Sequence, residues 1–288
     1  MILERKAMDT YRKDNLVAWC IVPFDACKRG PRERAEMLQR LGIRSLAYDW
    51  RDEHIATFDE ELAQLQAHDI RLAAFYLLGG WPEDEDSAWD DRLNKAGFEF
   101  LQRNRLKTDV WLSYGGQGTE GVSGDEDRYD AAAQRVGVMA GVINSLGCRL
   151  GIYNHGGWGG EPNTMVEIAR RLESRDVGIV YNFHHGHEHL DEMPGAFDAM
   201  LPHLVCVNLN GTTRGAEKVL PLGTGEEDLD ILRMVRNSGY DGPIGILDHR
   251  DGIDAELSLR ENIEGLQTLL AKLGDDSAMA TYSGRSRP

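Results

Sequence analysis

The chain has 288 residues, of which 41% are hydrophobic, so it can bury a sizeable core. Its 32 basic and 48 acidic side chains give a net charge of −16, which argues against nucleic acid or an anionic membrane as a partner. The N-terminus lacks the apolar segment of a secretory signal, and no apolar run reaches the roughly 18 residues of a membrane span. We therefore expect a cytoplasmic protein that binds a small molecule.

Eight apolar, β-rich runs follow one another and predict strands at 16–24, 45–50, 70–78, 110–114, 149–153, 177–181, 204–209 and 243–247. Segments with helical periodicity lie between and after them, at 31–41, 58–68, 92–103, 128–146, 163–173, 191–200, 228–237 and 257–273. Most of these strands are apolar throughout rather than alternating, which indicates parallel strands covered on both faces. Eightfold β–α alternation predicts a single (β/α)₈ TIM barrel of the α/β class.

The alternative fold is a doubly wound open sheet, which requires a glycine-rich phosphate-binding turn after its first strand. Residues 23–30 follow the first predicted strand and contain no GxGxxG pattern. No proline- or serine-rich linker divides the chain. We therefore expect one domain over residues 1–288, in which 1–14 form an N-terminal extension and 275–288 form a flexible tail.

Histidines gather in the second half of the chain, where seven of the nine follow residue 150. Four of them lie in the segment YNFHHGHEH (181–189), and another lies in YNHGG (153–157). Both segments begin where a predicted strand ends, and in such barrels the reactive groups come from the carboxyl ends of the strands. Imidazole can donate a proton, accept one or bind a metal near neutral pH. The pattern predicts a histidine-rich site at this end of the barrel.

Further side chains near the same strand ends are expected to bind the substrate. Amides in a barrel mouth need hydrogen-bond partners, which substrate hydroxyls or a structural network would supply. The loops after the last two strands often hold an anion, but the acidic residues 226–228 disfavour a phosphate. An unphosphorylated sugar is therefore preferred. The predicted substrate-binding residues are Tyr153, Trp158, Asn182, Asn208, Asn210 and Lys218.

Five segments carry a resemblance to a known family: LGIYNHGG (150–157), VGIVYNFHHGH (177–187), VCVNLNG (205–211), LGTGEEDLDILRMV (222–235) and GYDGPIGI (239–246). Over about residues 15–273 the chain resembles the sugar phosphate isomerases and epimerases of the xylose-isomerase-like barrel superfamily. The resemblance implies proton transfer at a carbon next to a sugar carbonyl. Typical members bind a divalent cation through two Glu, one Asp and one His. This chain has other residues at those positions: Tyr153, Asn182, Asn208 and Leu247.

The family's Asp-x-x-His pair keeps only its histidine, His185, and two hypotheses follow. In the first, His155, His185, His187 and His249 bind a divalent cation such as Zn²⁺, Mn²⁺, Fe²⁺ or Ni²⁺. If this segment is extended, His185 and His187 point the same way and His184 points the opposite way. In the second, the imidazoles move protons without a metal. Either way, the predicted catalytic residues are His185, His155 and His249.

We therefore predict an isomerase, epimerase or lyase that acts on a carbohydrate or keto-sugar. The alternative is a non-catalytic barrel that has lost its metal site and binds a sugar or a partner protein. Histidines and asparagines gather at the same end of the barrel as the lost ligands. This favours an enzyme with altered chemistry over a protein without catalytic activity. A nuclease of the same superfamily would need several metals and a basic groove, against which the charge of −16 argues. A homo-oligomer is compatible with the sequence.

Overall fold

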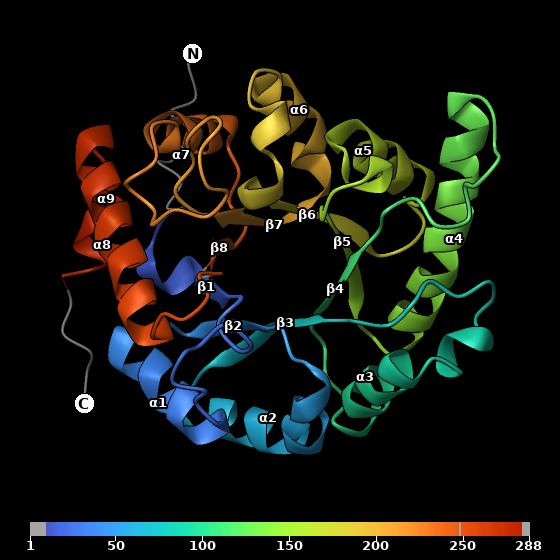
Figure 1. Cartoon of the computed structure of the whole chain (residues 1–288), viewed down its shortest axis with the longest axis horizontal. Coiled ribbons are helices and arrows are strands. Elements are labelled where there is room, and N and C mark those ends of the chain that lie inside the picture. The colour runs from blue at the N-terminus through green and yellow to red at the C-terminus, as the bar shows by residue number, and fades with distance from the viewer. Residues whose placement is uncertain (1–9, 248, 284–288) are drawn as a thin grey trace, which may run out of the picture.

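The computed structural model describes residues 10–247 and 249–283. Its strands are all parallel and pair in chain order, and the last pairs with the first to close a barrel (Figure 1). The predicted single (β/α)₈ TIM barrel is thereby confirmed. The strands are β1 (Leu16–Trp19), β2 (Ser45–Tyr48), β3 (Arg71–Tyr76), β4 (Asp109–Ser113), β5 (Arg149–Tyr153), β6 (Val177–Asn182), β7 (Leu204–Leu209) and β8 (Ile244–Leu247).

Helices follow the strands and form the outer ring seen in Figure 1. Helix α1 starts at Pro31, a residue suited to the first helical turn, and ends before Gly42, whose φ of 72° terminates it. The α-helices are α1 (Pro31–Leu41), α2 (Phe58–Ala67), α3 (Arg92–Arg103), α4 (Asp125–Ser145), α5 (Pro162–Arg171), α6 (Met193–Met200), α7 (Asp228–Ser238), α8 (Ala255–Leu273) and α9 (Asp276–Ala280).

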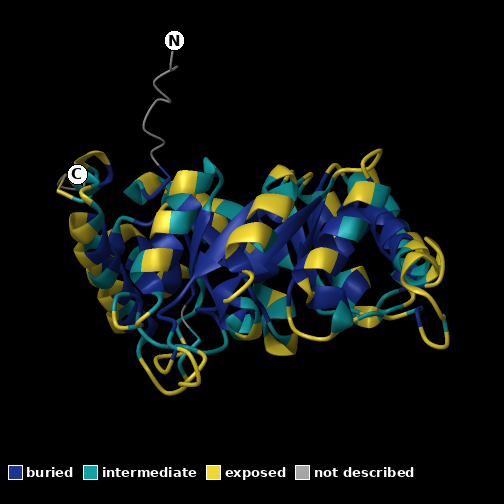
Figure 2. Cartoon of the chain, turned by 90° about the horizontal axis from the view of Figure 1, so that it is seen from above, coloured by how far each residue is buried: buried dark blue, intermediate teal, exposed yellow. Residues whose placement is uncertain are grey.

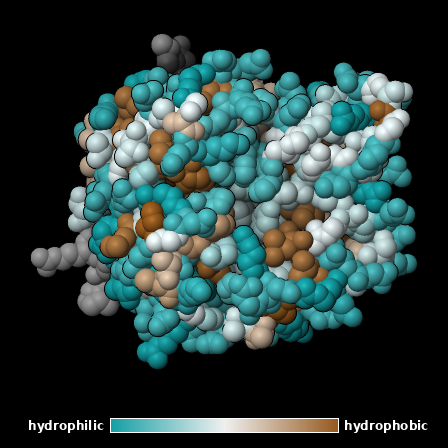
Figure 3. All heavy atoms as spheres, in the orientation of Figure 1, coloured by the Kyte–Doolittle hydropathy of each residue, from teal (hydrophilic) through white to brown (hydrophobic). Residues whose placement is uncertain are grey.

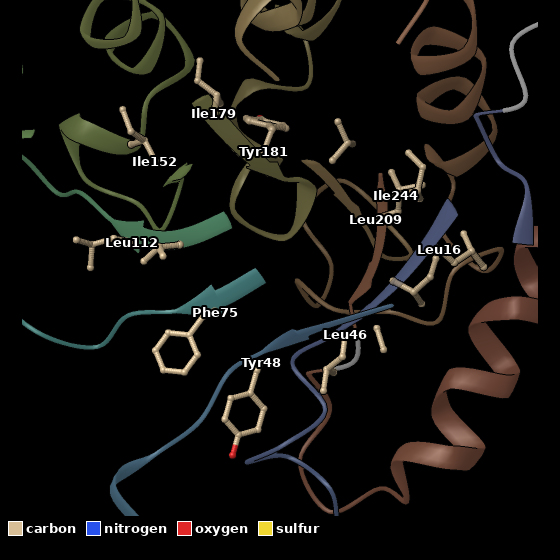
Figure 4. Close-up of a cluster of buried hydrophobic side chains, with 14 of the residues drawn as sticks. Leu16, Leu46, Tyr48, Phe75, Leu112, Ile152, Ile179, Tyr181, Leu209 and Ile244 are labelled. Atoms are coloured by element: carbon tan, nitrogen blue, oxygen red, sulfur yellow. The ribbon is translucent and has the colours of Figure 1, made fainter. Parts of the chain in front are cut away.

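The largest hydrophobic core lies between the barrel and its helices. Figure 4 shows its members on all eight strands, among them Leu16, Phe75, Leu112 and Ile244, and Figure 2 shows the buried strands at the centre. A second, smaller apolar cluster includes Val17, Trp111 and Leu247. Because side chains alternate along a strand, these two clusters lie on opposite faces of the sheet, and the second fills the barrel interior.

The first strand is shorter than predicted and ends at Trp19. The next residue, Cys20, has a φ of 58°, a left-handed backbone conformation that is uncommon for residues other than glycine. This conformation turns the chain out of the sheet at the carboxyl end of the barrel. Residues 20–24 are therefore a loop, from which Cys20 and Phe24 line a cavity, while Ile21 and Val22 pack into the core.

The expectation of a flexible tail over 275–288 is wrong for the part that the structure describes. Residues 276–280 form α9, in which Ala278 is fully buried. The hydroxyl of Tyr282 donates a hydrogen bond to the carbonyl oxygen of Tyr11 at 2.7 Å. The small polar residues of this segment suggested fraying, but Ala278 and Tyr282 anchor it. Residues 284–288, and 1–9 of the predicted extension, lie outside the described ranges.

The viewed face of the molecule is mostly hydrophilic, with scattered apolar patches (Figure 3). Only two large hydrophobic side chains are notably exposed in the described part, Ile253 and Leu257. In the same part, no helix combines the length and hydrophobicity needed to cross a membrane.

Candidate active site

A cavity of about 210 Å³ lies at the carboxyl ends of the barrel strands. This volume lies below the roughly 300–1,000 Å³ of pockets for drug-sized ligands, so it suits one small molecule. It lies at the end of the barrel where enzymes of this fold place their reactive groups. The residues that line it are Trp19, Cys20, Phe24, Asp49, Arg51, Tyr76, Tyr153, His155, His185 and His249.

Four histidines from three separate segments form one cluster at this cavity. The ring centres of His155 and His185 are 4.4 Å apart. The ring of His184 lies 4.1 Å from that of His185 and 5.2 Å from that of His249. His155 follows β5, His184 and His185 follow β6, and His249 follows β8, so the closure of the barrel brings these distant residues together.

The predicted orientations of the histidines after β6 are wrong. Phe183–His185 form a 3₁₀-helix rather than an extended segment, so side chains there do not alternate between two faces. The side-chain oxygen of Asn182 caps this helix by accepting a hydrogen bond from the His184 amide at 3.1 Å. As a result His184 contacts the cluster, whereas His187 does not line the cavity.

Burial keeps the imidazoles of the cluster uncharged. Desolvation lowers the pKa of His185 to about 2 and the pKa of His184 to about 4, and neighbouring histidines contribute further. It also lowers the pKa values of His155 and His249. A neutral imidazole can donate and accept hydrogen bonds, but one with so low a pKa is a poor proton acceptor at neutral pH. These rings are therefore better suited to form hydrogen bonds with the oxygen atoms of a substrate than to abstract a proton from it.

Among the described residues that line the cavity, Asp49 carries the acidic side chain, and it follows β2 directly. Its Oδ1 accepts a hydrogen bond from the amide of Val22 at 3.3 Å, and its Oδ2 is buried without a partner among the described residues. Burial raises the pKa of this carboxyl to about 7, even though Arg51 opposes the shift. Sequence reasoning missed Asp49, which falls within the predicted strand 45–50 and belongs to no motif.

Arg51 is the cationic side chain of the cavity. Its Nη1 donates hydrogen bonds to the carbonyl oxygens of Asp49 at 2.9 Å and Trp50 at 2.7 Å. The guanidinium also lies 5.8 Å from the centre of the Phe24 ring, whose centre is 4.0 Å from that of the tilted His249 ring. These contacts fix its position at the wall of the cavity. Sequence reasoning missed Arg51, because an isolated arginine in an early loop gives no signal.

Aromatic side chains form one wall of the cavity. The Tyr153 ring lies 5.6 Å from the rings of both Trp19 and Tyr76. Its hydroxyl accepts hydrogen bonds from Trp19 Nε1 at 3.3 Å and from the side-chain amide of Asn182. Burial raises the pKa of Tyr153 well above its ordinary value, so the phenol is neutral. A flat aromatic surface of this kind suits the C–H face of a sugar ring.

The four positions that hold the cation in the resembling family do not fit one here. Tyr153 and Leu247 belong to the apolar cluster inside the barrel. Asn182 is bonded to Tyr153, and Asn208 Oδ1 lies 3.5 Å from the Cys206 thiol while its Nδ2 has no partner in the described structure. Hard divalent cations require carboxylate oxygens, and this set supplies none.

The histidines do not form a ready-made cation site either. Within the described ranges, one group of three or more His, Cys, Asp or Glu residues has ligand atoms all within 4.8 Å of one another, and it is Asp25, Cys27 and Asp254. Arg29 already pairs with Asp25 at 2.9 Å and with Asp254 at 2.8 Å. A metal bound by His155, His185, His187 and His249 therefore stays a prediction, and it would require these side chains to rearrange.

Most residues predicted to bind the substrate lie away from the cavity. Asn182 is buried behind Tyr153, and Asn210 Nδ2 donates to the carbonyl oxygens of Gly211 at 2.7 Å and Lys218 at 3.0 Å. The Lys218 residue is exposed. Trp158 packs against Tyr129 at 5.5 Å and against the Arg128 guanidinium at 3.8 Å. Of the predicted set, which also included Asn208, Tyr153 is the member that lines the cavity.

The chain is thus a (β/α)₈ protein with a small cavity at the carboxyl end of its closed parallel barrel. The model of the xylose isomerase-like TIM barrel family matches residues 35–269, and this chain belongs to that family. The resemblance seen in the sequence is thereby confirmed.

Several known proteins are similar to the chain. An uncharacterised protein of Methanocaldococcus jannaschii is 24% identical over 134 residues, which span 43% of this chain and 45% of that protein, so less than half of that relative is matched. The 3-keto-D-glucoside 4-epimerase of E. coli has a TM-score of 0.61 and 14% identity, over 90% of this chain and 100% of that one. IolI, solved with a zinc atom, has a TM-score of 0.65 and 15% identity, over 89% and 98%. D-psicose 3-epimerase from Clostridium cellulolyticum has a TM-score of 0.58 and 11% identity, over 89% and 98%. At these identities the solved structures establish the fold alone.

Proposed function

We propose that this protein is an isomerase or epimerase that moves a proton at a carbon next to the carbonyl of a small sugar or keto-sugar. The observation that carries the proposal is Asp49, a buried carboxyl whose Oδ2 has no partner in the described part of the chain and which lines the cavity together with His155, His185 and His249. The family and two sugar epimerases of the same fold support the substrate class.

Asp49 is the proposed acid and base. A group whose pKa is about 7 exists in both protonation states near neutral pH, which is the condition for efficient general acid–base catalysis. Its carboxylate takes a proton from the carbon next to the carbonyl, which leaves an enediolate. Return of the proton to the neighbouring carbon, with the hydroxyl proton passing to the other oxygen of the enediolate, gives the isomer. Protonation of the original carbon from its opposite face by a water molecule, with Asp49 returning its proton to the hydroxide that forms, gives the epimer. The sequence analysis named His185 among the predicted catalytic residues, but the low pKa of that ring favours Asp49 as the base.

The neutral imidazoles are proposed to stabilise the enediolate. His155 and His185 lie side by side at the cavity, and each can donate an N–H to an oxygen of the substrate. A neutral imidazole can donate a hydrogen bond to the oxyanion that develops on the substrate. Donors fixed in this position lower the barrier to proton abstraction. Elimination of a group from the next carbon, a lyase reaction, would use the same first step.

The proposal needs no metal in the reaction. A bound cation would polarise the carbonyl oxygen, which is the role it has in metal-assisted proton transfer. The family positions Tyr153, Asn182, Asn208 and Leu247 do not supply a suitable donor set, so we derive no step through a cation. The histidine N–H groups take over the stabilisation of the oxygen.

A sugar-binding barrel without catalysis is the second candidate. One observation favours it: apolar packing around Tyr153 and Leu247 occupies two of the family's four ligand positions. Such a protein would bind the same sugars without exchanging their protons. The two candidates therefore differ in one measurable property.

Proton exchange with solvent separates the two. The protein is incubated in D₂O with keto-hexoses and hexuronates, and the C–H signals next to the carbonyl are followed by NMR. We expect exchange with the wild type and a loss of about a hundredfold or more in Asp49→Asn. Glu53→Gln is the control, because it removes the same charge from an exposed side chain nearby in the sequence. This variant should exchange protons at the wild-type rate. Binding without any exchange in the wild type would favour the non-catalytic candidate.

A further inference from the structure

The charges that line the cavity point to a particular kind of substrate. We infer that the substrate carries a carboxylate, which Arg51 binds, so that the protein acts on a sugar acid rather than on a neutral sugar. This inference deepens the proposed function, since it concerns the same cavity, and it rests on that function only for the location of the site.

Arg51 lines the cavity and lacks an ion pair among the described residues, whereas several other sheltered arginines have one. Arg34 is paired with Glu61, Arg149 with Asp109 at 2.9 Å, and Arg29 with Asp25 at 2.9 Å. Arg51 forms no ion pair with any residue that the structure describes, and only its Nη1 is engaged, by two backbone carbonyls. Sheltered charges are normally paired, and the described residues supply no acid partner for Arg51.

The neighbouring carboxyl does not fill this role. Arg51 donates to the backbone carbonyl of Asp49 and not to its side chain, whose Oδ2 has no partner in the described ranges. Among the described residues that line the cavity, Arg51 carries the cationic side chain, although the whole chain carries −16. An anion that enters the cavity can therefore pair with a guanidinium that no described acid occupies.

The geometry favours a carboxylate over a phosphate. The Nε and Nη2 nitrogens of Arg51 have no described protein partner, and together they present the two parallel donors that a carboxylate accepts. A phosphate carries about two negative charges and usually requires several donors. Here Arg51 is the cationic side chain among the described residues that line the cavity, which suits the single charge of a carboxylate. The cavity of about 210 Å³ has room for a six-carbon sugar acid.

Two matched pairs of ligands test the inference by isothermal titration calorimetry. D-glucuronate is compared with D-glucose, and D-gluconate with D-glucitol, so that a carboxylate is present or absent at either end of a six-carbon chain. We expect at least one acid to bind the wild type about tenfold or more tightly than its neutral partner, because a hydrogen-bonded charge pair supplies that difference. Equal binding within both pairs, or no binding of either acid, would overturn the inference.

Variants at Arg51 show whether the preference arises there. Arg51→Gln should remove it, and Arg51→Lys, which keeps the charge without the paired donors, should retain part of it. Arg44→Gln is the control, because it removes the same charge from an exposed residue at the opposite end of β2. A preference for the acid that survives in Arg51→Gln would contradict the inference. Circular dichroism measures whether each variant is folded. If Arg51→Gln does not fold, the reduced preference for the acid in Arg51→Lys decides the test.

The outcome separates this inference from the proposed function. Suppose that a neutral sugar exchanges its proton with solvent, and that the acids bind no more tightly than their neutral partners. The isomerase proposal would then stand, and the inference that the substrate carries a carboxylate would be wrong. A second readout follows from the effect of Arg51 on Asp49, whose pKa the guanidinium lowers. Arg51→Gln should therefore shift the pH dependence of exchange to higher pH, which a purely structural role would not do.

Discussion

The side-chain amide of Asn182 donates a hydrogen bond to the hydroxyl of Tyr153 across the β5–β6 pair. Both residues occupy positions where typical family members carry acidic cation ligands. Here they form a neutral pair, and the indole of Trp19 adds a second donor to the same hydroxyl at 3.3 Å. The lost carboxylates have thus been replaced by a bonded network that closes the barrel interior beneath the cavity.

Tyr153→Phe should therefore destabilise the protein. The substitution leaves the buried donors of Asn182 and Trp19 without their acceptor, at a cost of about 1–3 kcal/mol. Urea unfolding followed by fluorescence measures the change in the free energy of unfolding. Tyr129→Phe is the matched control, since no hydrogen bond to that hydroxyl is described and its ring stacks on Trp158. Equal stability of Tyr153→Phe and the wild type would mean that the network contributes nothing.

Asp49→Asn should stabilise the protein at alkaline pH. The carboxyl has a pKa of about 7 in the fold and 3.8 as its ordinary value, so the folded state holds the proton more tightly. The unfolded state then binds fewer protons between these values, and stability falls as the pH rises through this window. The neutral amide escapes this loss, which is on the order of 1–4 kcal/mol at about pH 8.

Thermal unfolding at about pH 5 and pH 8 tests this prediction. The difference between variant and wild type should grow with pH. Glu61, whose pKa burial also raises to about 7, is present in both proteins, so the comparison isolates Asp49. A constant difference between the two pH values would show that Asp49 is ionised throughout.

His185→Gln should make the fold more resistant to acid. Burial lowers the pKa of His185 to about 2 from an ordinary 6.5, so the unfolded state binds more protons between these values. Stability is therefore lost as the pH falls below about 6.5, and glutamine removes this contribution. The melting temperature should decline less on acidification than in the wild type. His189→Gln, which changes a histidine outside the cavity, is the control and should decline like the wild type.

Removal of metals should leave sugar binding and proton exchange unchanged. Hard cations need carboxylate donors that the family positions here do not provide, and the histidines are not arranged as a site. Elemental analysis of the purified protein, before and after dialysis against EDTA, is compared with exchange activity. A stoichiometric metal that disappears in both His155→Ala and His185→Ala would establish the four-histidine cation site instead.

The fold could be predicted almost completely from the sequence. Several bounds agree to the residue, as for β5 (Arg149–Tyr153) and α1 (Pro31–Leu41), because apolar runs and helical periodicity report burial directly. The errors lie where local conformation departs from regular structure. Cys20 ends β1 early through its left-handed backbone, and residues 183–185 turn into a 3₁₀-helix.

The site could be predicted only in part. His155, His185 and His249 follow strand ends and line one cavity, and barrel closure was sufficient to bring them there. Asp49 and Arg51 were missed because their significance is a matter of burial and of unfilled hydrogen-bonding capacity. Neither property can be read from residue type or spacing. Asn182 and Asn210 were wrongly predicted to bind the substrate. Their hydrogen-bonding capacity is already used by other parts of the chain.

The pH dependence of proton exchange tests the central claim, that Asp49 moves the proton. Exchange at the carbon next to the carbonyl is measured by NMR between about pH 5 and pH 9, for the wild type and for Asp49→Asn. We predict that the wild-type rate rises with pH through a midpoint near 7, the pKa of Asp49, and that the variant loses about a hundredfold or more at every pH. Exchange in Asp49→Asn within about tenfold of the wild type, with the same midpoint, would contradict the account.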